Sequence, residues 1–280
     1  MLEGFDSRFA DVNGTRLHYV IGGEGDPLVL LPGWPRTWYQ FHKIMPRLAE
    51  RYQVIAVDLR GMGDSDKPVH GYDKKTMARD IYELVRSLGL NQVNVAGEDI
   101  GSMVAHSFAA NHPEAIRKLA LWEAGHPTEA FNEVRALTQP GQPTTPWWFA
   151  FNELHGLPEK LAEGRFRYIV DWLIDFHATT PEAFSEETRD LYAAAYNTPD
   201  AIRAGNGWYQ TFQQDIVDLK DYPVLTLPVL ALGGFYYPLM VAQLEGRATD
   251  VRFVELKGAG HYLAEERPDE VVRELTEFFA

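Results

Sequence analysis

Cysteine is the clearest absence from this 280-residue chain, which contains none. Disulfide bonds and thiolate metal ligands are therefore excluded, and folding does not depend on the redox state of the compartment. Positive charge is also scarce, because 26 Lys and Arg residues stand against 40 Asp and Glu residues, a formal net charge of −14. Such a chain repels phosphate backbones and anionic lipid, so we expect neither nucleic acid nor a membrane as a partner.

Long hydrophobic runs are missing as well. No apolar stretch approaches membrane-spanning length, and residues 1–14 lack the basic start and apolar core of a signal peptide, so we expect a cytoplasmic protein. Internal repeats, low-complexity tracts and long linkers are also absent. What is present is 45% hydrophobic and 12% aromatic content, which suffices for a large packed core.

The first half of the chain has the pattern of an α/β protein. Asn13-Gly14 separates two short strand-like segments and predicts a hairpin. Short apolar runs then alternate with segments of helical period such as 75–88 and 102–111; the runs are 27–33, 52–61, 92–99 and 117–124. This alternation predicts a mostly parallel central sheet with helices on both faces.

The strand pattern stops from 127 to 212, where the chain becomes aromatic and helical. Apolar strand-like runs return at 227–234 and 251–256, and the last helix is expected over 268–279. We therefore predict an α/β core formed by residues 1–126 and 213–280, with an inserted helical cap over 127–212.

Residues at strand ends deserve the closest inspection, because ligands of open α/β sheets bind beyond the carboxyl ends of the strands. The segment "GEDIG", Gly97 to Gly101, closes one predicted strand and opens the next helix. Small residues on both sides of a strand-to-helix turn are typical of the nucleophile elbow, whose central residue projects into a pocket. Here that residue is Asp99, which the free N–H groups of the helix would keep ionised. The competing interpretation is an Asp that only caps the helix.

A second strand end carries His261, in the Gly-flanked loop "GAGH" that follows the last predicted strand. A nucleophile followed by a histidine near the C-terminus is the chain order expected of this architecture. The plainer alternative is a surface histidine without a role.

Taken together, these segments resemble the α/β-hydrolase fold, in its epoxide hydrolase and haloalkane dehalogenase branch, whose members use Asp in place of Ser. The resemblance covers nearly the whole chain. "LLPGWP" is similar to the oxyanion loop of that branch, "DLRGMGDSDKP" to a segment common in it, "GEDIG" to its elbow, "GAGHYLAEERP" to its histidine loop and 127–212 to its helical cap.

The resemblance implies further site residues. The acid of the triad usually follows the strand that here reads "LPVLALGG", but the next residues, "GGFYYPLMV", contain no carboxylate. Some dehalogenases of this fold carry the acid after the strand that follows the elbow helix, which selects Glu123 to orient the imidazole of His261. The resemblance also places the backbone N–H groups of Trp34 and Ile100 in the oxyanion hole. A cis Trp34-Pro35 bond is an option that the sequence does not decide.

The cap is expected to supply a proton donor to the leaving oxygen, because opening an epoxide requires one. By resemblance this is Tyr209. The second tyrosine expected early in the cap is missing, and Trp147 and Trp148 occupy that segment, either binding substrate or packing the cap on the core. Tyr168, Tyr236 or Tyr237 could replace the missing donor.

Glu98 precedes the predicted nucleophile, where the elbow usually has His, and Pro32 also replaces a usual His. We count Glu98 among the pocket residues, with its side chain expected behind Asp99 because successive side chains at a strand end point in opposite directions. A second carboxylate nearby would raise the pKa of one of the two. It could also convert the site to proton-transfer chemistry.

The resulting hypothesis is an epoxide hydrolase for small apolar or aromatic substrates, in which Asp99 forms an ester that a His261-activated water cleaves. The alternatives are a dehalogenase, a lyase or isomerase with Asp99 or Glu98 as base, and a degenerate hydrolase fold that only binds an apolar ligand. Neither metal nor organic cofactor is implied, because the histidines are scattered and no dinucleotide fingerprint is present. A homodimer is left open.

Overall fold

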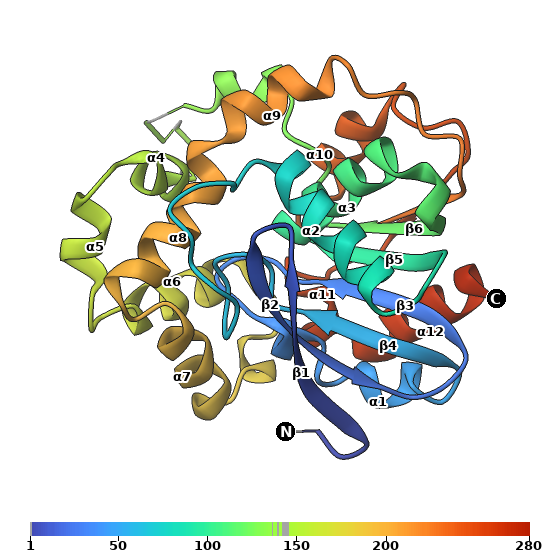
Figure 1. Ribbon diagram of the computed structural model, residues 1–280. Helices are drawn as coiled ribbons and strands as arrows, with labels where there is room; N and C mark the ends of the chain where they lie inside the picture. The colour runs from blue at the N-terminus through green and yellow to red at the C-terminus, as the bar shows by residue number, and fades with distance from the viewer. Residues whose placement is uncertain (1, 136, 139, 142–145) are drawn as a thin grey trace.

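One eight-stranded sheet organises the molecule, with helices on both of its faces (Figure 1). This computed structural model describes residues 2–135, 137–138, 140–141 and 146–280. The strand order is β1-β2-β4-β3-β5-β6-β7-β8. The strands are β1 (Phe5–Val12), β2 (Thr15–Gly22), β3 (Asp26–Leu31), β4 (Tyr52–Val57), β5 (Val93–Glu98), β6 (Ile116–Trp122), β7 (Val229–Gly233) and β8 (Val251–Glu255).

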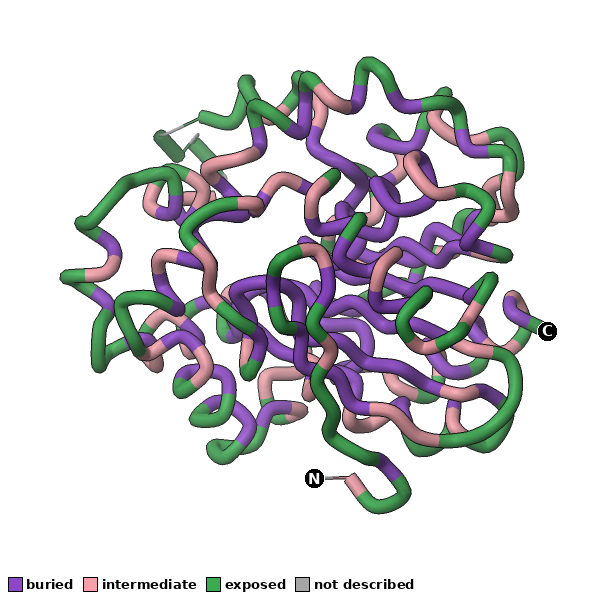
Figure 2. Tube along the Cα trace, in the orientation of Figure 1, coloured by how far each residue is buried: buried purple, intermediate pink, exposed green. Residues whose placement is uncertain are grey.

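The sheet is parallel from β4 to β8 and antiparallel only where β2 joins β1 and β4. The predicted hairpin is present: Val12 pairs with Thr15, and both turn residues, Asn13 and Gly14, have positive φ. The mostly parallel sheet with flanking helices is thus confirmed. Its central strands β3, β5, β6 and β7 are buried almost throughout, because helices cover both faces (Figure 2).

Two apolar cores lie on opposite faces of the sheet. One contains the inner faces of α2 and α3, through residues such as Ile81 and Phe108. The other contains those of α1 and α12, through residues such as Met45 and Leu275. The helices are α1 (Met45–Leu48), α2 (Lys74–Ser87), α3 (Ile100–Asn111), α4 (Trp147–Glu153), α5 (Leu157–Ala162), α6 (Arg167–His177), α7 (Glu186–Ala195), α8 (Pro199–Gln210), α9 (Phe212–Leu219), α10 (Tyr237–Leu244), α11 (Leu263–Glu266) and α12 (Pro268–Phe279).

Between β6 and β7 the described part of the chain contributes helices α4–α9 and no strand. Helices α4–α8, yellow-green to orange in Figure 1, gather beside one end of the sheet. The exact division into a core and a cap over 127–212 stays a prediction, and residues 136, 139 and 142–145 of that range lie outside the described residues.

Buried polar contacts fasten these helices to the core. Lys74, at the start of α2, is fully buried with its Nζ 2.8 Å from a carboxylate oxygen of Asp215 on α9. Tyr196, which follows α7, donates its hydroxyl hydrogen to the carbonyl of Arg36 in the loop after β3, at 2.7 Å. Removing one partner of such a buried pair is costly, so the helical layer is held firmly over the loops at the strand ends.

Candidate active site

The turn between β5 and α3 places Asp99 on strained backbone, with φ 56° and ψ −121°. Asp tolerates positive φ better than most L-residues, but a ψ of −121° lies outside the left-handed helical region, and such strain concentrates at functional sites. The flanking glycines are required for space. A Cβ atom on Gly97 would overlap the carbonyl of Gly101, and one on Gly101 would overlap the carbonyl of Leu31. The turn therefore has the geometry of a nucleophile elbow.

The Asp99 carboxylate faces the cavity and makes no capping hydrogen bond to α3, so the helix-cap interpretation is wrong. Its Oδ1 instead accepts a hydrogen bond from the backbone N–H of Trp34, at 3.0 Å. The Trp34-Pro35 bond is cis. Ile100 is the first residue of α3, and its N–H is one of the N-terminal groups that a helix leaves without an internal partner.

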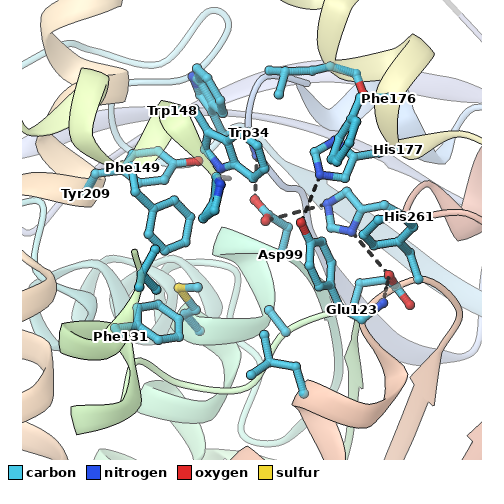
Figure 3. A pocket seen from close by; sticks show the side chains of 18 of the residues that line it. Trp34, Asp99, Glu123, Phe131, Trp148, Phe149, Phe176, His177, Tyr209 and His261 are labelled. Atoms are coloured by element: carbon cyan, nitrogen blue, oxygen red, sulfur yellow. Dashed lines mark hydrogen bonds and ion pairs between the residues drawn. The ribbon is translucent and has the colours of Figure 1, made fainter. Parts of the chain in front are cut away.

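His261 lies next to the predicted nucleophile, with Nε2 3.6 Å from Oδ2 of Asp99 and Nδ1 3.3 Å from Oε2 of Glu123 (Figure 3). Burial lowers the pKa of His261 to about 4, although the carboxylate of Asp99 opposes this shift. The imidazole is therefore neutral at neutral pH, which is the form that can accept a proton from water.

Glu123 directly follows β6 and, like Asp99, has a positive φ, 58°. Its carboxylate accepts hydrogen bonds from the backbone N–H groups of Gly234 and Tyr236, the latter at 2.9 Å. Burial raises the pKa of Glu123 to about 8, and the two N–H donors oppose that rise. The loop after β7, where the acid of the triad is usually found in the family that the sequence resembles, therefore contains no acid here. It supplies two backbone N–H donors to Glu123.

Glu98 is not a cavity residue, and the expectation that it binds substrate is wrong. Its side chain lies behind the elbow, fully buried, as the alternation of a strand predicts. Its Oε1 is 3.2 Å from Nη1 of Arg36 and its Oε2 accepts a hydrogen bond from Nε2 of Gln40 at 2.7 Å. Burial raises the pKa of Glu98 to about 7, and the guanidinium of Arg36 opposes this rise. The charge of Asp99 adds only the smallest contribution to it.

Tyr209, on α8, lines the cavity and packs edge-on against Trp34 at a ring separation of 5.4 Å. In Figure 3 Asp99 lies between Tyr209 and His261. Burial raises the pKa of Tyr209 well above its ordinary value, and the charge of Asp99 adds to this, so the hydroxyl keeps its proton. Among the described residues that hydroxyl has no hydrogen-bond partner, which leaves it available to a bound molecule.

The two tryptophans at the start of α4 differ. Trp148 lines the cavity, but Trp147 does not and packs against Phe151 of α4 and Trp172 of α6. The expectation that Trp147 binds substrate is therefore wrong. Neighbouring residues on a helix point about 100° apart, and α4 turns Trp148 and Phe149, but not Trp147, toward the cavity.

The cavity has a volume of about 310 Å³ and is mainly apolar. Its described lining contains no Lys or Arg. The lining comprises Trp34, Asp99, Glu123, Trp148, Tyr209 and His261, together with Met103, Ala124, Ala130, Phe131, Val134, Pro146, Phe149, Leu173, Phe176, His177, Phe235, Tyr236, Leu239, Gln243 and Tyr262.

Of the three tyrosines considered for the second donor, only Tyr236 reaches the cavity; Tyr168 is 77% exposed and Tyr237 is not in the lining. His177, the last residue of α6, also lines the cavity, and its Nε2 lies 2.9 Å from the hydroxyl of Tyr236. Sequence reasoning missed His177. Its only signal is a polar residue at the end of the amphipathic helix "RYIVDWLIDFH".

The described residues form neither a metal-binding cluster nor a membrane-spanning helix. No group of three or more His, Cys, Asp and Glu side chains is arranged to hold a metal ion. None of the described helices has the length and apolar character needed to cross a bilayer.

Comparison with known proteins agrees with this geometry. Residues 26–169 match the alpha/beta hydrolase fold family. The chain is 36% identical to a soluble epoxide hydrolase from Corynebacterium sp. (strain C12), over 97% of this chain and 96% of the relative. It is 30% identical to a fluoroacetate dehalogenase from Burkholderia sp., over 100% and 95% of the two chains. The solved structure of the epoxide hydrolase CorEH superposes with a TM-score of 0.84 at 34% identity, covering 98% of each chain.

Proposed function

This chain belongs to the α/β-hydrolase fold family, and from that premise we propose that it hydrolyses epoxides through an ester formed on Asp99. The observation that carries the proposal is the line of three side chains, Asp99, His261 and Glu123, on a cavity that also holds Tyr209. A carboxylate nucleophile and a proton donor are the two groups that epoxide opening requires.

In the first step an Asp99 oxygen attacks a ring carbon while the Tyr209 hydroxyl gives its proton to the departing ring oxygen. In the second step neutral His261 removes a proton from water, which attacks Cγ of the ester. The N–H groups of Trp34 and Ile100 stabilise the resulting oxyanion. Glu123 accepts Nδ1–H of the imidazole and, above its pKa of about 8, its carboxylate balances the charge of the imidazolium that forms in this step.

The apolar lining favours small apolar or aromatic epoxides. We propose that the helices of 127–212 act as the cap over this site. A cytoplasmic location and a homodimer remain predictions from the sequence.

Dehalogenation is the second candidate, because a relative carries that name and because Trp148 and Tyr209 could donate hydrogen bonds to a halide. Haloacids are poor candidates, since a carboxylate substrate needs a cation and the described lining has none. Glu98 is an unsuitable base for a lyase or isomerase step, because Arg36 and Gln40 bind it away from the cavity.

The test is to replace His261 with Gln, incubate the variant with styrene oxide and weigh the intact protein. We expect a stable adduct of one substrate mass that maps to Asp99, because the ester forms but water is not activated. Asp99→Asn is the matched control and should give no adduct. A parallel incubation with 1-chlorohexane separates the candidates: chloride release by the wild type, with no diol from any epoxide, would favour dehalogenation.

A further inference from the structure

A second polar pair, Tyr236 and His177, lies in the cavity beside the three side chains of the proposed mechanism. Nδ1 of His177 is 3.0 Å from the carbonyl oxygen of Leu173, which can only accept, so Nδ1 carries the hydrogen. Burial lowers the pKa of His177 to about 3, so the ring is neutral. Nε2 is therefore an acceptor, and the Tyr236 hydroxyl, 2.9 Å away, donates to it.

The backbone ties both residues to the predicted triad. The N–H of Tyr236 donates to Oε2 of Glu123 at 2.9 Å, and the carbonyl of His177 accepts from the N–H of His261 at 3.0 Å. The next cap residues are fixed as well, because a carboxylate oxygen of Glu266 accepts from the N–H of Thr179 at 2.7 Å. The pair is thus positioned relative to His261 by direct hydrogen bonds from both core and cap.

The three rings form a compact cluster. Ring centroids are 5.3 Å apart for His177 and His261, 5.3 Å for Tyr236 and His261, and 5.7 Å for His177 and Tyr236. Because the hydroxyl hydrogen of Tyr236 is committed to His177, its oxygen offers only lone pairs to the cavity. Neutral His261, with Nδ1–H directed at Glu123, likewise offers a lone pair at Nε2.

We propose that Tyr236 Oη and His261 Nε2 together hold the water that cleaves the ester, and that His177 is the positioning residue that orients the Tyr236 hydroxyl. The inference rests on the proposed function. Each of the two acceptors takes one hydrogen of the water, which directs an oxygen lone pair at Cγ of Asp99. Two acceptors define the orientation of a water molecule, whereas one leaves it free to rotate.

In ester hydrolysis a bond forms between the water oxygen and Cγ of Asp99 while one water proton passes to Nε2 of His261. The bond from Cγ to the ester oxygen, which is the Asp99 oxygen that attacked the ring carbon, then breaks. The imidazolium returns its proton to that oxygen, which leaves as the second hydroxyl of the diol, and the water oxygen takes its place on Asp99. Asp99 is left as the acid, and its proton restores the hydroxyl of Tyr209, which lost one during ring opening.

Donation by Tyr236 to the ring oxygen is the competing role. It would take the hydrogen from His177 and leave the buried Nε2 without a partner, an arrangement that proteins avoid. Tyr209 carries no such commitment among the described residues. The geometry therefore divides the two tyrosines between the two steps.

The test separates ester formation from ester hydrolysis by rapid mixing with styrene oxide and mass measurement of the quenched protein. In Tyr236→Phe we expect ester formation within about threefold of wild type and hydrolysis slower by about 10- to 100-fold, so that the ester accumulates. Tyr237→Phe is the matched control, since this neighbouring tyrosine is outside the lining, and both steps should be unchanged.

His177 is tested by rescue. His177→Phe removes the acceptor and should slow hydrolysis as Tyr236→Phe does, whereas His177→Gln retains an acceptor oxygen and should recover much of the rate. The double variant Tyr236→Phe/His177→Phe should be no slower than Tyr236→Phe alone, because the two residues act as one unit.

Two results would overturn the inference while leaving the proposed function intact. One is hydrolysis of the ester at the wild-type rate in Tyr236→Phe. The other is slow ester formation with unchanged hydrolysis, which would assign Tyr236 to the leaving oxygen. Absence of any ester, even in His261→Gln, would instead refute the proposed function and this inference with it.

Discussion

Glu123 would influence the reaction through the imidazole of His261, whose Nδ1 lies 3.3 Å from its Oε2. Its charge, which is present above its pKa of about 8, matters only when His261 has taken a proton during ester hydrolysis, so the comparison is made at pH 9. We therefore expect Glu123→Gln to slow hydrolysis by about two to four orders of magnitude, as loss of the orienting acid does in comparable triads, with ester formation nearly unchanged. Single-turnover kinetics with styrene oxide measures both steps.

Glu123→Asp is the control for that prediction. It keeps the charge but shortens the side chain, so its loss should be clearly smaller than that of Glu123→Gln. Equal losses would mean that the shape of the site matters and the charge does not. A larger effect on ester formation than on hydrolysis would contradict the role assigned to Glu123.

At the scale of elements, Arg36 joins the loop after β3 to the elbow after β5. Its guanidinium is fully buried, 3.2 Å from Glu98 and 3.5 Å from Glu265 on α11, and its centre lies 4.6 Å from the ring centroid of Tyr262. Removing the cation leaves two buried carboxyl groups without compensation. We expect Arg36→Met to lower the free energy of unfolding by about 3–5 kcal/mol at pH 8, measured by urea titration.

Arg167 offers a matched control on the surface. It contacts three carboxylates, Asp171, Glu186 and Asp190, but lies at the surface of α6, where water screens the charges. Arg167→Met should therefore change the free energy of unfolding by about 1 kcal/mol or less. Equal losses in the two variants would show that burial does not govern the strength of these ion pairs.

The elements that sequence analysis could predict are those with a local signal. The strands ending at Glu98 and Glu255 correspond to short apolar runs in the sequence, and the glycines around Asp99 and His261 mark the turns after them. Glu98 behind the elbow follows from strand alternation alone. Trp147 was assigned to the cavity wrongly, because the face of α4 that points into the cavity is set by tertiary packing and not by any local sequence pattern.

His177 and Arg36 show the other limit. His177 reaches the cavity only because the end of α6 docks on the loop of His261, a contact between residues 84 positions apart. Arg36 is buried between carboxylates from two distant segments, and an isolated Arg in a loop predicts exposure. Neither arrangement has a periodicity or motif from which it could be predicted.

For the whole molecule, buried titratable groups make stability depend on pH in two opposite ways. Burial lowers the pKa of six histidines: to about 4 for His106 and His261, to about 3 for His177, well below the ordinary value for His126, and in the same direction for His42 and His112. Below about pH 6.5 the unfolded chain binds protons at these positions and the folded chain does not. Their contribution therefore lowers stability as pH falls.

Buried carboxyl groups act in the other direction. Burial raises the pKa of Glu98 and Glu265 to about 7 and that of Glu123 to about 8. Between about pH 4.5 and these values the folded chain binds protons that the unfolded chain does not, so stability rises as pH falls through that window. Of these two sets, only the three carboxyl groups differ in protonation between the folded and unfolded chain above about pH 6.5, and only the histidines do so below about pH 4.5.

We therefore expect the free energy of unfolding to rise from pH 8 to about 6.5, to change little down to about 4.5, and to fall steeply below. Each proton that the unfolded chain binds and the folded chain does not lowers the free energy of unfolding by about 1.4 kcal/mol per pH unit as the pH falls. Below about pH 4.5 the histidines together therefore change stability more than any single surface ion pair does. Urea titrations between pH 3.5 and 8.5 measure the curve. In His106→Gln the slope of the free energy of unfolding against pH below about pH 4.5 should decrease by the equivalent of one proton, whatever the effect of the substitution on stability at pH 7. The slope depends on the difference in bound protons between the folded and unfolded chain and not on the contacts that the side chain makes. Stability that increases steadily from pH 4 to 8 would show that these groups do not titrate as their burial requires.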